Sequence, residues 1–132
     1  MKTIFILFAL ALLCSQALAS IDKDNLTGAW KVIDTQKFME DSENQRVFES
    51  AKQQFIAQAS QANEISSTQL TVQEIKEIST QVVAGWNIRF EMNLVDDNGK
   101  VYDVTLVVFY QPWTNTDKLT EYKINKWTEY EL

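Results

Sequence analysis

Carboxylates are plentiful among the residues of this 132-residue chain that could catalyse a reaction, since Asp and Glu together number 18. The sequence has no histidine, so it offers no imidazole base, catalytic triad or histidine metal site. Acidic pairs occur at Asp22/Asp24, Glu40/Asp41 and Asp96/Asp97, where we expect chain ends or turns, and we interpret them as solvated or capping groups. The spacing of the carboxylates alone does not exclude a carboxylate-pair glycosidase. However, so short a chain has few residues with which to form the walls of a substrate cleft. We therefore do not expect an enzyme, a metal site or a cofactor.

The first nineteen residues have the pattern of a secretory signal peptide. Lys2 is followed by an apolar run from Ile4 to Leu13 that is too short to span a bilayer, and Ala17-Leu18-Ala19 is typical of a signal peptidase site. Cleavage after Ala19 leaves residues 20–132, which we expect to form a single domain. The mature protein is expected to be secreted, or to lie in the lumen of the secretory or lysosomal pathway.

Cleavage also removes the only cysteine, Cys14, so the mature chain has no disulfide, thiol nucleophile or thiolate ligand. Its stability must then come from packing, and we expect a monomer. The net charge of −6 becomes −7 when Lys2 is removed, which argues against nucleic acid or an anionic membrane as a partner. Asn25-Leu26-Thr27 is a candidate glycosylation site at Asn25.

Three uncharged segments remain, and they could bind a partner. Gln81-Val82-Val83-Ala84-Gly85 joins two strand-like runs, residues 69–80 and 86–94, so it predicts a hairpin with an apolar tip. Such a tip is either a buried corner or a surface that a partner covers. Gln111-Pro112-Trp113-Thr114 has a similar place between two later strand-like runs, and Gly28-Ala29-Trp30 precedes them both.

One helix and four or five strands must position these segments. Ser42 and Gln45 form a capping-box pattern with Ser42 as the N-cap, and helical periodicity follows over about residues 43–61. A phase shift after Val72 predicts a bulge, a bend or an uncertain strand start, and Asn98-Gly99 predicts a hairpin turn. The strand-like runs are residues 69–80, 86–94, 101–110 and 119–127. This pattern predicts an α+β domain with the helix packed on an antiparallel sheet.

Together the three segments resemble motifs of the cystatin family. Gln81-Val82-Val83-Ala84-Gly85 matches the Gln-x-Val-x-Gly loop of that family, Pro112-Trp113 matches its second-hairpin Pro-Trp, and Gly28 matches its N-terminal glycine. In the chain the three motifs occur in the family's order, and the predicted helix lies between Gly28 and the Gln81–Gly85 motif. The resemblance covers about residues 26–126. The opening from Gly28 is most similar to that of plant-type members, although Ala29 stands where many members have a second glycine.

The resemblance implies one long helix on a curved four- to five-stranded antiparallel sheet, and reversible inhibition of papain-like, cathepsin-like cysteine proteases. The protease-binding residues that it implies are Gly28, Gln81, Val82, Val83, Ala84, Gly85, Pro112 and Trp113. Some cystatins also inhibit legumain, an asparagine-specific protease, through a loop after the helix. Ala62-Asn63-Glu64 lies in roughly that region, so Asn63 is a candidate legumain contact. The simpler interpretation makes Asn63 a helix C-terminal residue in the left-handed conformation.

Two alternatives stay open. Gly28-Ala29-Trp30 also fits the Gly-x-Trp opening of lipocalins and fatty-acid-binding proteins, which carry a small apolar ligand in a barrel, but such a barrel needs about eight strands or more. The other alternative is a non-inhibitory binding module with the cystatin fold. The sequence leaves open the target protease, glycosylation of Asn25 and dimerisation by exchange of the first hairpin.

Overall fold

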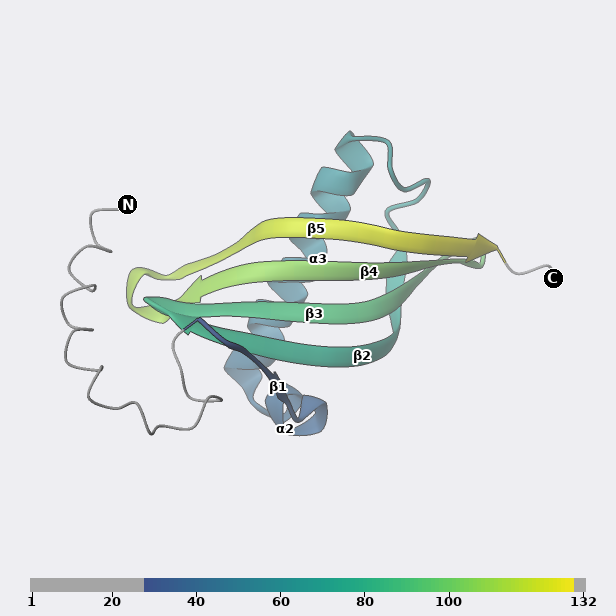
Figure 1. Ribbon diagram of the computed structural model, residues 1–132. Helices are drawn as coiled ribbons and strands as arrows, with labels where there is room; N and C mark the ends of the chain where they lie inside the picture. Colours follow the sequence, from purple (N-terminus) through teal and green to yellow (C-terminus); the bar gives the residue numbers. More distant parts are fainter. Residues whose placement is uncertain (1–27, 130–132) are drawn as a thin grey trace, which may run out of the picture.

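A computed structural model describes residues 28–129, and the strands in this range form one five-stranded antiparallel sheet that a long helix crosses (Figure 1). The strands lie in the sheet in the order in which they occur in the chain. The elements are β1 (Trp30–Ile33), α2 (Thr35–Glu40), α3 (Ser42–Gln61), β2 (Leu70–Val83), β3 (Gly85–Asp96), β4 (Lys100–Gln111), the 3-10 turn η3 (Pro112–Thr114) and β5 (Thr116–Glu129). The predicted α+β fold is confirmed. The expected signal peptide, residues 1–19, and Asn25 lie outside the described residues.

Helix α3 lies where helical periodicity predicted it, but the predicted N-cap is wrong. Asp41, not Ser42, caps the helix: its Oδ1 accepts hydrogen bonds from the backbone N–H groups of Glu43, at 2.9 Å, and Asn44, at 3.0 Å. The backbone of Asp41 is extended, which suits an N-cap, whereas Ser42 is already helical. The Gln45 amide donates to the carbonyl of Met39 at 2.7 Å instead of completing a capping box with Ser42.

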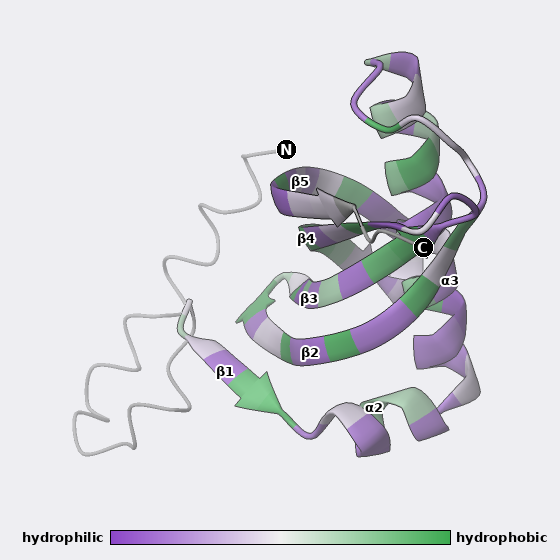
Figure 2. Ribbon diagram, turned by 90° about the vertical axis from the view of Figure 1, so that its right-hand side faces the viewer, coloured by the Kyte–Doolittle hydropathy of each residue, from purple (hydrophilic) through white to green (hydrophobic). Residues whose placement is uncertain are grey.

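The apolar face of α3 packs on the sheet and forms the core. Alternate residues of the central strands point towards the helix, and Figure 2 shows hydrophobic and hydrophilic residues alternating along β2. Phe90 on β3 receives the ring edges of Phe38 and Phe48, with centroids 5.8 and 5.1 Å apart. Each fully buried large side chain of this kind stabilises the fold by about 1.5–3 kcal/mol. The fully buried core side chains include Val47, Ala51, Phe55, Ala59, Ile78, Phe90, Met92, Leu94, Tyr102, Val104, Leu106 and Val108.

Helix α2 was not predicted from the sequence, because six residues are too few to show a periodic pattern. Asp34 caps it by accepting from the N–H of Lys37 at 3.0 Å, and Phe38 anchors it in the core. Among the described residues, neither this helix nor α3 is long and apolar enough to cross a membrane.

Two irregular points of the sheet lie where the sequence placed them, whereas the register shifts of the β4–β5 pair at Asp103/Val104 and Val107/Val108 were not predicted. The β2–β3 register shifts between Val72 and Glu74 and again between Ile75 and Glu77, which confirms the predicted bulge and bends the strand across the helix. The Asn98-Gly99 turn is also confirmed. Asp96 stabilises this turn, since its Oδ1 accepts from the N–H groups of Asn98 and Lys100 at 2.8 and 2.9 Å.

Candidate functional site

The three uncharged segments meet at one end of the sheet, on the left in Figure 1. There the β2–β3 hairpin turns at Ala84, η3 connects β4 to β5, and the N–H of Gly28 donates to the carbonyl of Val82 at 3.3 Å. We call this surface the wedge and define it as Gly28, residues 81–85 and Pro112-Trp113. All eight protease-binding residues implied by the resemblance therefore lie together at this end of the sheet.

The turn of the first hairpin is shorter than the sequence predicted. Residues 81–85 were expected to form a loop, but the β2–β3 ladder continues through them and ends with the pair Val83 and Gly85, leaving Ala84 alone at the turn. The reason is that the two valines favour extended backbone and the partner strand begins at once. Because the ladder reaches the tip, its backbone needs little ordering when a partner binds.

Gly85 has a role inside the molecule that the motif alone did not indicate. Its φ is +121°, a conformation that other residues rarely adopt, and a Cβ built on it would lie 2.7 Å from the carbonyl oxygen of Tyr110. The glycine thus lets the backbones of β3 and β4 approach closely at the base of the tip.

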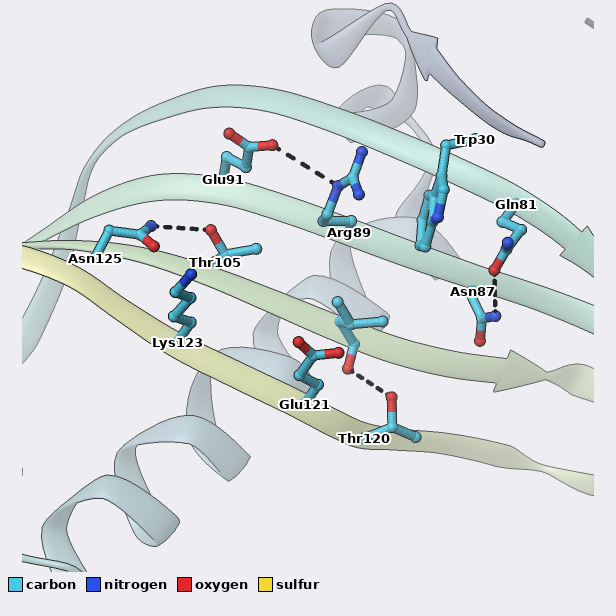
Figure 3. Close-up of a pocket in the computed structure, with 11 residues that line it drawn as sticks. Trp30, Gln81, Asn87, Arg89, Glu91, Thr105, Thr120, Glu121, Lys123 and Asn125 are labelled. Carbon is cyan, nitrogen blue, oxygen red and sulfur yellow. Dashed lines mark hydrogen bonds and ion pairs between the residues drawn. The ribbon is translucent and has the colours of Figure 1, made fainter. Parts of the chain in front are cut away.

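Side-chain amides join the three wedge segments. Gln81 donates from Nε2 to the carbonyl of Gly28 at 2.7 Å and accepts at Oε1 from Nδ2 of Asn87, also at 2.7 Å, a bond visible in Figure 3. Gln111 donates from Nε2 to the carbonyl of Ala84 at 2.8 Å. Asn87 was not predicted as a site residue, and Gln111 was predicted only as part of the second uncharged segment, without its bond to the first tip. The available signal was that each is an uncharged amide near a motif.

Aromatic and aliphatic side chains give the wedge its exposed apolar surface. Trp113 is 64% exposed and Val82 is 51% exposed. Trp86, which pairs with Val82 across the hairpin, is 38% exposed and lies with its ring centroid 6.5 Å from that of Trp113. Trp86 was predicted only as a strand residue, so its contribution to the apolar surface of the wedge was not predicted.

A polar cluster at the start of α3 supports these rings. The hydroxyl of Tyr110, whose ring packs against Trp86, donates to Glu43 Oε2 at 2.9 Å. Glu43 also pairs with Arg46 at 2.8 Å, and the hydrogen bonds from Arg46 and then Tyr110 lower the pKa of Glu43 to about 2. Burial, followed by the bond to Glu43, raises the pKa of Tyr110. Tyr110 therefore stays neutral and Glu43 charged over the physiological pH range.

The wedge carries no charge although the protein is acidic. Neither residues 81–87 nor residues 111–116 include a charged side chain. The core of a protein–protein interface is depleted of charged residues in the same way, because burying an unpaired charge is costly.

In each described acidic pair that could have supported catalysis, one member has a structural role. Asp41 caps α3, and Asp96 holds the β3–β4 turn. Asp22/Asp24 lies outside the described residues. Within residues 28–129, no three His, Cys, Asp or Glu side chains gather where they could hold a metal ion.

The opposite face of the sheet from α3 has a shallow, open hollow of about 720 Å³ (Figure 3). The Arg89 guanidinium lies 4.3 Å from the centre of the Trp30 ring, and Arg89 also pairs with Glu91 at 3.7 Å. Lys123 and Glu121 add opposite charges from β5. This face is polar with mixed charges, as expected for a solvated sheet surface.

Asn63 lies at the C-terminal end of α3, away from the wedge (Figure 1). Its φ is +59°, its N–H donates to the carbonyl of Ser60 at 3.0 Å, and the next N–H, from Glu64, reaches Ala59 at 2.8 Å. This is a Schellman motif, so the interpretation of Asn63 as a left-handed helix-terminal residue is confirmed. The side chain of Asn63 is exposed. Contact with legumain remains a prediction.

An exposed surface that is uncharged and rich in aromatic residues has the composition found at the core of protein–protein interfaces. The cystatin-domain family model matches residues 32–126, so the chain belongs to the cystatin family. A search of curated proteins found no match. Among solved structures, a salivary cystatin from the soft tick Ornithodoros moubata is similar, with a TM-score of 0.54 and 22% identity over 76% of this chain and 100% of that chain. At this identity the likeness establishes the fold.

Proposed function

We propose that the protein is a secreted, reversible, tight-binding inhibitor of papain-like cysteine proteases, and that the wedge occludes the active-site cleft of the protease. Membership of the cystatin family supports an inhibitor rather than an enzyme. The observation that carries the proposal is the wedge: three segments, distant in sequence, form one uncharged apolar surface and are joined by hydrogen bonds from Gln81 and Gln111.

The geometry of the wedge explains how it would bind tightly. Trp113 is the exposed aromatic anchor, and an interface residue of this type often contributes about 2 kcal/mol or more to binding. Ala84 presents a small side chain at the turn, so the backbone of the first hairpin tip can approach the catalytic cysteine of the protease closely. Since the tip is already paired as a strand ladder, association costs little conformational entropy.

The geometry also supports inhibition without cleavage. A protease cuts a segment that it can hold extended in its cleft, whereas the peptide around Ala84 is a tight turn between two paired strands. Opening this turn for attack would break the ladder beside it. At Gly28, the bond to Gln81 keeps the N-terminal segment beside the first tip, although Ala29 reduces the flexibility of that segment compared with a second glycine.

The barrel-type carrier alternative does not agree with the open five-stranded sheet formed by the described residues. The non-inhibitory binding module is the alternative to test. The test is a titration of residues 20–132 against papain and against an unrelated serine protease. We expect stoichiometric, reversible inhibition of papain and none of the serine protease. A folded monomer that leaves papain fully active would contradict the proposal and favour the non-inhibitory module.

A further inference from the structure

We propose that Gln111 is a positioning residue that fixes the two hairpin tips relative to each other, so that Ala84 and Trp113 reach a partner together. The proposal rests on the proposed function and adds to it a residue outside the recognised motifs. Gln111 ends β4, immediately before Pro112.

Gln111 uses both ends of its amide in this position. Its Nε2 donates to the carbonyl of Ala84 in the first tip at 2.8 Å, and its Oε1 accepts from the hydroxyl of Thr114 in η3 at 2.7 Å. A glutamine amide is both donor and acceptor, whereas an ionised glutamate only accepts and methionine forms neither of these bonds well. The side chain is therefore matched to a bridge between an acceptor and a donor.

The Gln111 side chain connects the two hairpins at a point where the β3–β4 strand pairing has ended. The β3–β4 register ends at the pair Trp86 and Tyr110, one residue before Gln111. Beyond that pair, the backbone of Gly85 still lies close to Tyr110 and Gln111, and the tips are also joined by the Gln111–Ala84 bond and by the contact of the Trp113 ring with the Trp86 ring. Consecutive strand residues point to opposite faces, so Gln111 acts on the face opposite to Tyr110 and the Trp86 ring. One connection on each face restrains the tips against twisting in either direction.

The first test is the isosteric variant Gln111→Glu. At about pH 7 its carboxylate cannot donate to the Ala84 carbonyl and repels it, so we expect affinity for papain to fall about tenfold relative to the wild type. Below about pH 4.3 a glutamic acid regains a proton and can donate again. We therefore expect the ratio of the variant's inhibition constant to that of the wild type to decrease as the pH is lowered from about 7 to about 4. A merely structural defect would give a ratio independent of pH.

The other titratable groups near position 111 are few, and the wild type and Gln111→Glu have the same ones. Along the β4–β5 pair they are Tyr110, Asp117, which pairs with Tyr110, and Lys118, which pairs with Phe109. From α3, Glu43 bonds to Tyr110 and Arg46 bonds to Asp117. Residues 81–87 of the facing tip carry none. These groups and the protease are the same in both measurements, so the ratio reports the change at position 111. Gln73→Glu, an exposed position at the other end of β2, is the matched control for an added negative charge and should inhibit like the wild type at every pH.

A second variant, Gln111→Met, keeps the length of the side chain without a charge, so it serves if Gln111→Glu does not fold. We expect about a tenfold loss of affinity that does not change with pH. Wild-type affinity in either folded variant at neutral pH, or a ratio for Gln111→Glu that stays constant with pH, would overturn the positioning role. Failure of the proposed function is distinguishable, because the wild type itself would then not inhibit papain.

Discussion

The Trp113 ring meets Trp86 edge to face, with ring centroids 6.5 Å apart and planes inclined at 62°. Trp86 in turn packs against Tyr110 at 6.1 Å, and the Tyr110 hydroxyl is bound to Glu43 at the start of α3. The exposed anchor of the second hairpin is thus connected through β3 and β4 to the helix. The placement of the wedge therefore depends on how the helix packs on the sheet.

Trp113→Ala is expected to weaken papain inhibition by about 2 kcal/mol or more, the scale of an aromatic hot spot. Because Trp113 is 64% exposed, the variant should fold and melt almost as the wild type does. The measurement is the inhibition constant together with a thermal melt. An unchanged inhibition constant would remove Trp113 from the interface.

Trp86 provides a matched comparison in a double-mutant cycle. Its edge contact with Trp113 should give a coupling energy of about 0.5–1.5 kcal/mol between Trp86→Ala and Trp113→Ala in papain binding. Strictly additive effects would mean that the two rings act independently.

Gly85→Ala is expected to destabilise the fold by about 2 kcal/mol and to impair inhibition, because φ is +121° and the new Cβ would meet the Tyr110 carbonyl oxygen at 2.7 Å. Gly28→Ala is the matched control: its φ is also positive, at +94°, but no atom lies within 4 Å of the Cβ position. Denaturant unfolding of both variants tests this. Equal losses of stability would show that the close approach to Tyr110 is unimportant.

Stability in acid should depend on Glu43. Its pKa is lowered from 4.5 to about 2, so its bonds to Arg46 and Tyr110 stabilise the fold above pH 4.5, and this contribution is lost as the pH falls through about 2. The melting temperature of Glu43→Gln should therefore lie below that of the wild type by a constant amount above pH 4.5, and the difference should shrink towards pH 2. A difference that does not change over this range would mean that the Glu43 carboxylate is not coupled to folding.

The mature protein should be a monomer whose melting temperature does not respond to reducing agent, because the only cysteine, Cys14, precedes the expected cleavage site. Thermal melts with and without reductant, and light scattering, test this. A reductant-dependent melting temperature would show that Cys14 is retained. A dimer would indicate exchange of the first hairpin.

A legumain assay of the wild type and Asn63→Ala tests the second proposed surface. Asn63 is exposed at the far end of α3, so the substitution should leave papain inhibition unchanged. If Asn63 contacts legumain, inhibition of that protease is lost in the variant. Inhibition that survives the substitution would refute the site, and no inhibition by either protein would leave Asn63 only as the end of the helix.

The sequence by itself determined the features that depend on local chemistry. The period of the apolar residues placed a helix over about residues 43–61, where the structure has α3, the phase change after Val72 marked the bulge, and Asn98-Gly99 marked the turn. These signals are readable because hydrophobic spacing and turn conformation are properties of neighbouring residues. The wedge motifs were readable for the same reason, as short contiguous patterns.

Only the tertiary structure decided which residues join those motifs into one surface. Gln111 lies 27 residues from Ala84, and Tyr110 lies 67 residues from Glu43, yet both pairs are hydrogen-bonded. Such contacts are set by strand register and by the packing of the helix on the sheet, and a one-residue change of register would turn each side chain to the opposite face. No local pattern contains that information, which is why the contacts of Trp86 with Trp113 and of Gln111 with Ala84 became visible only in the folded protein.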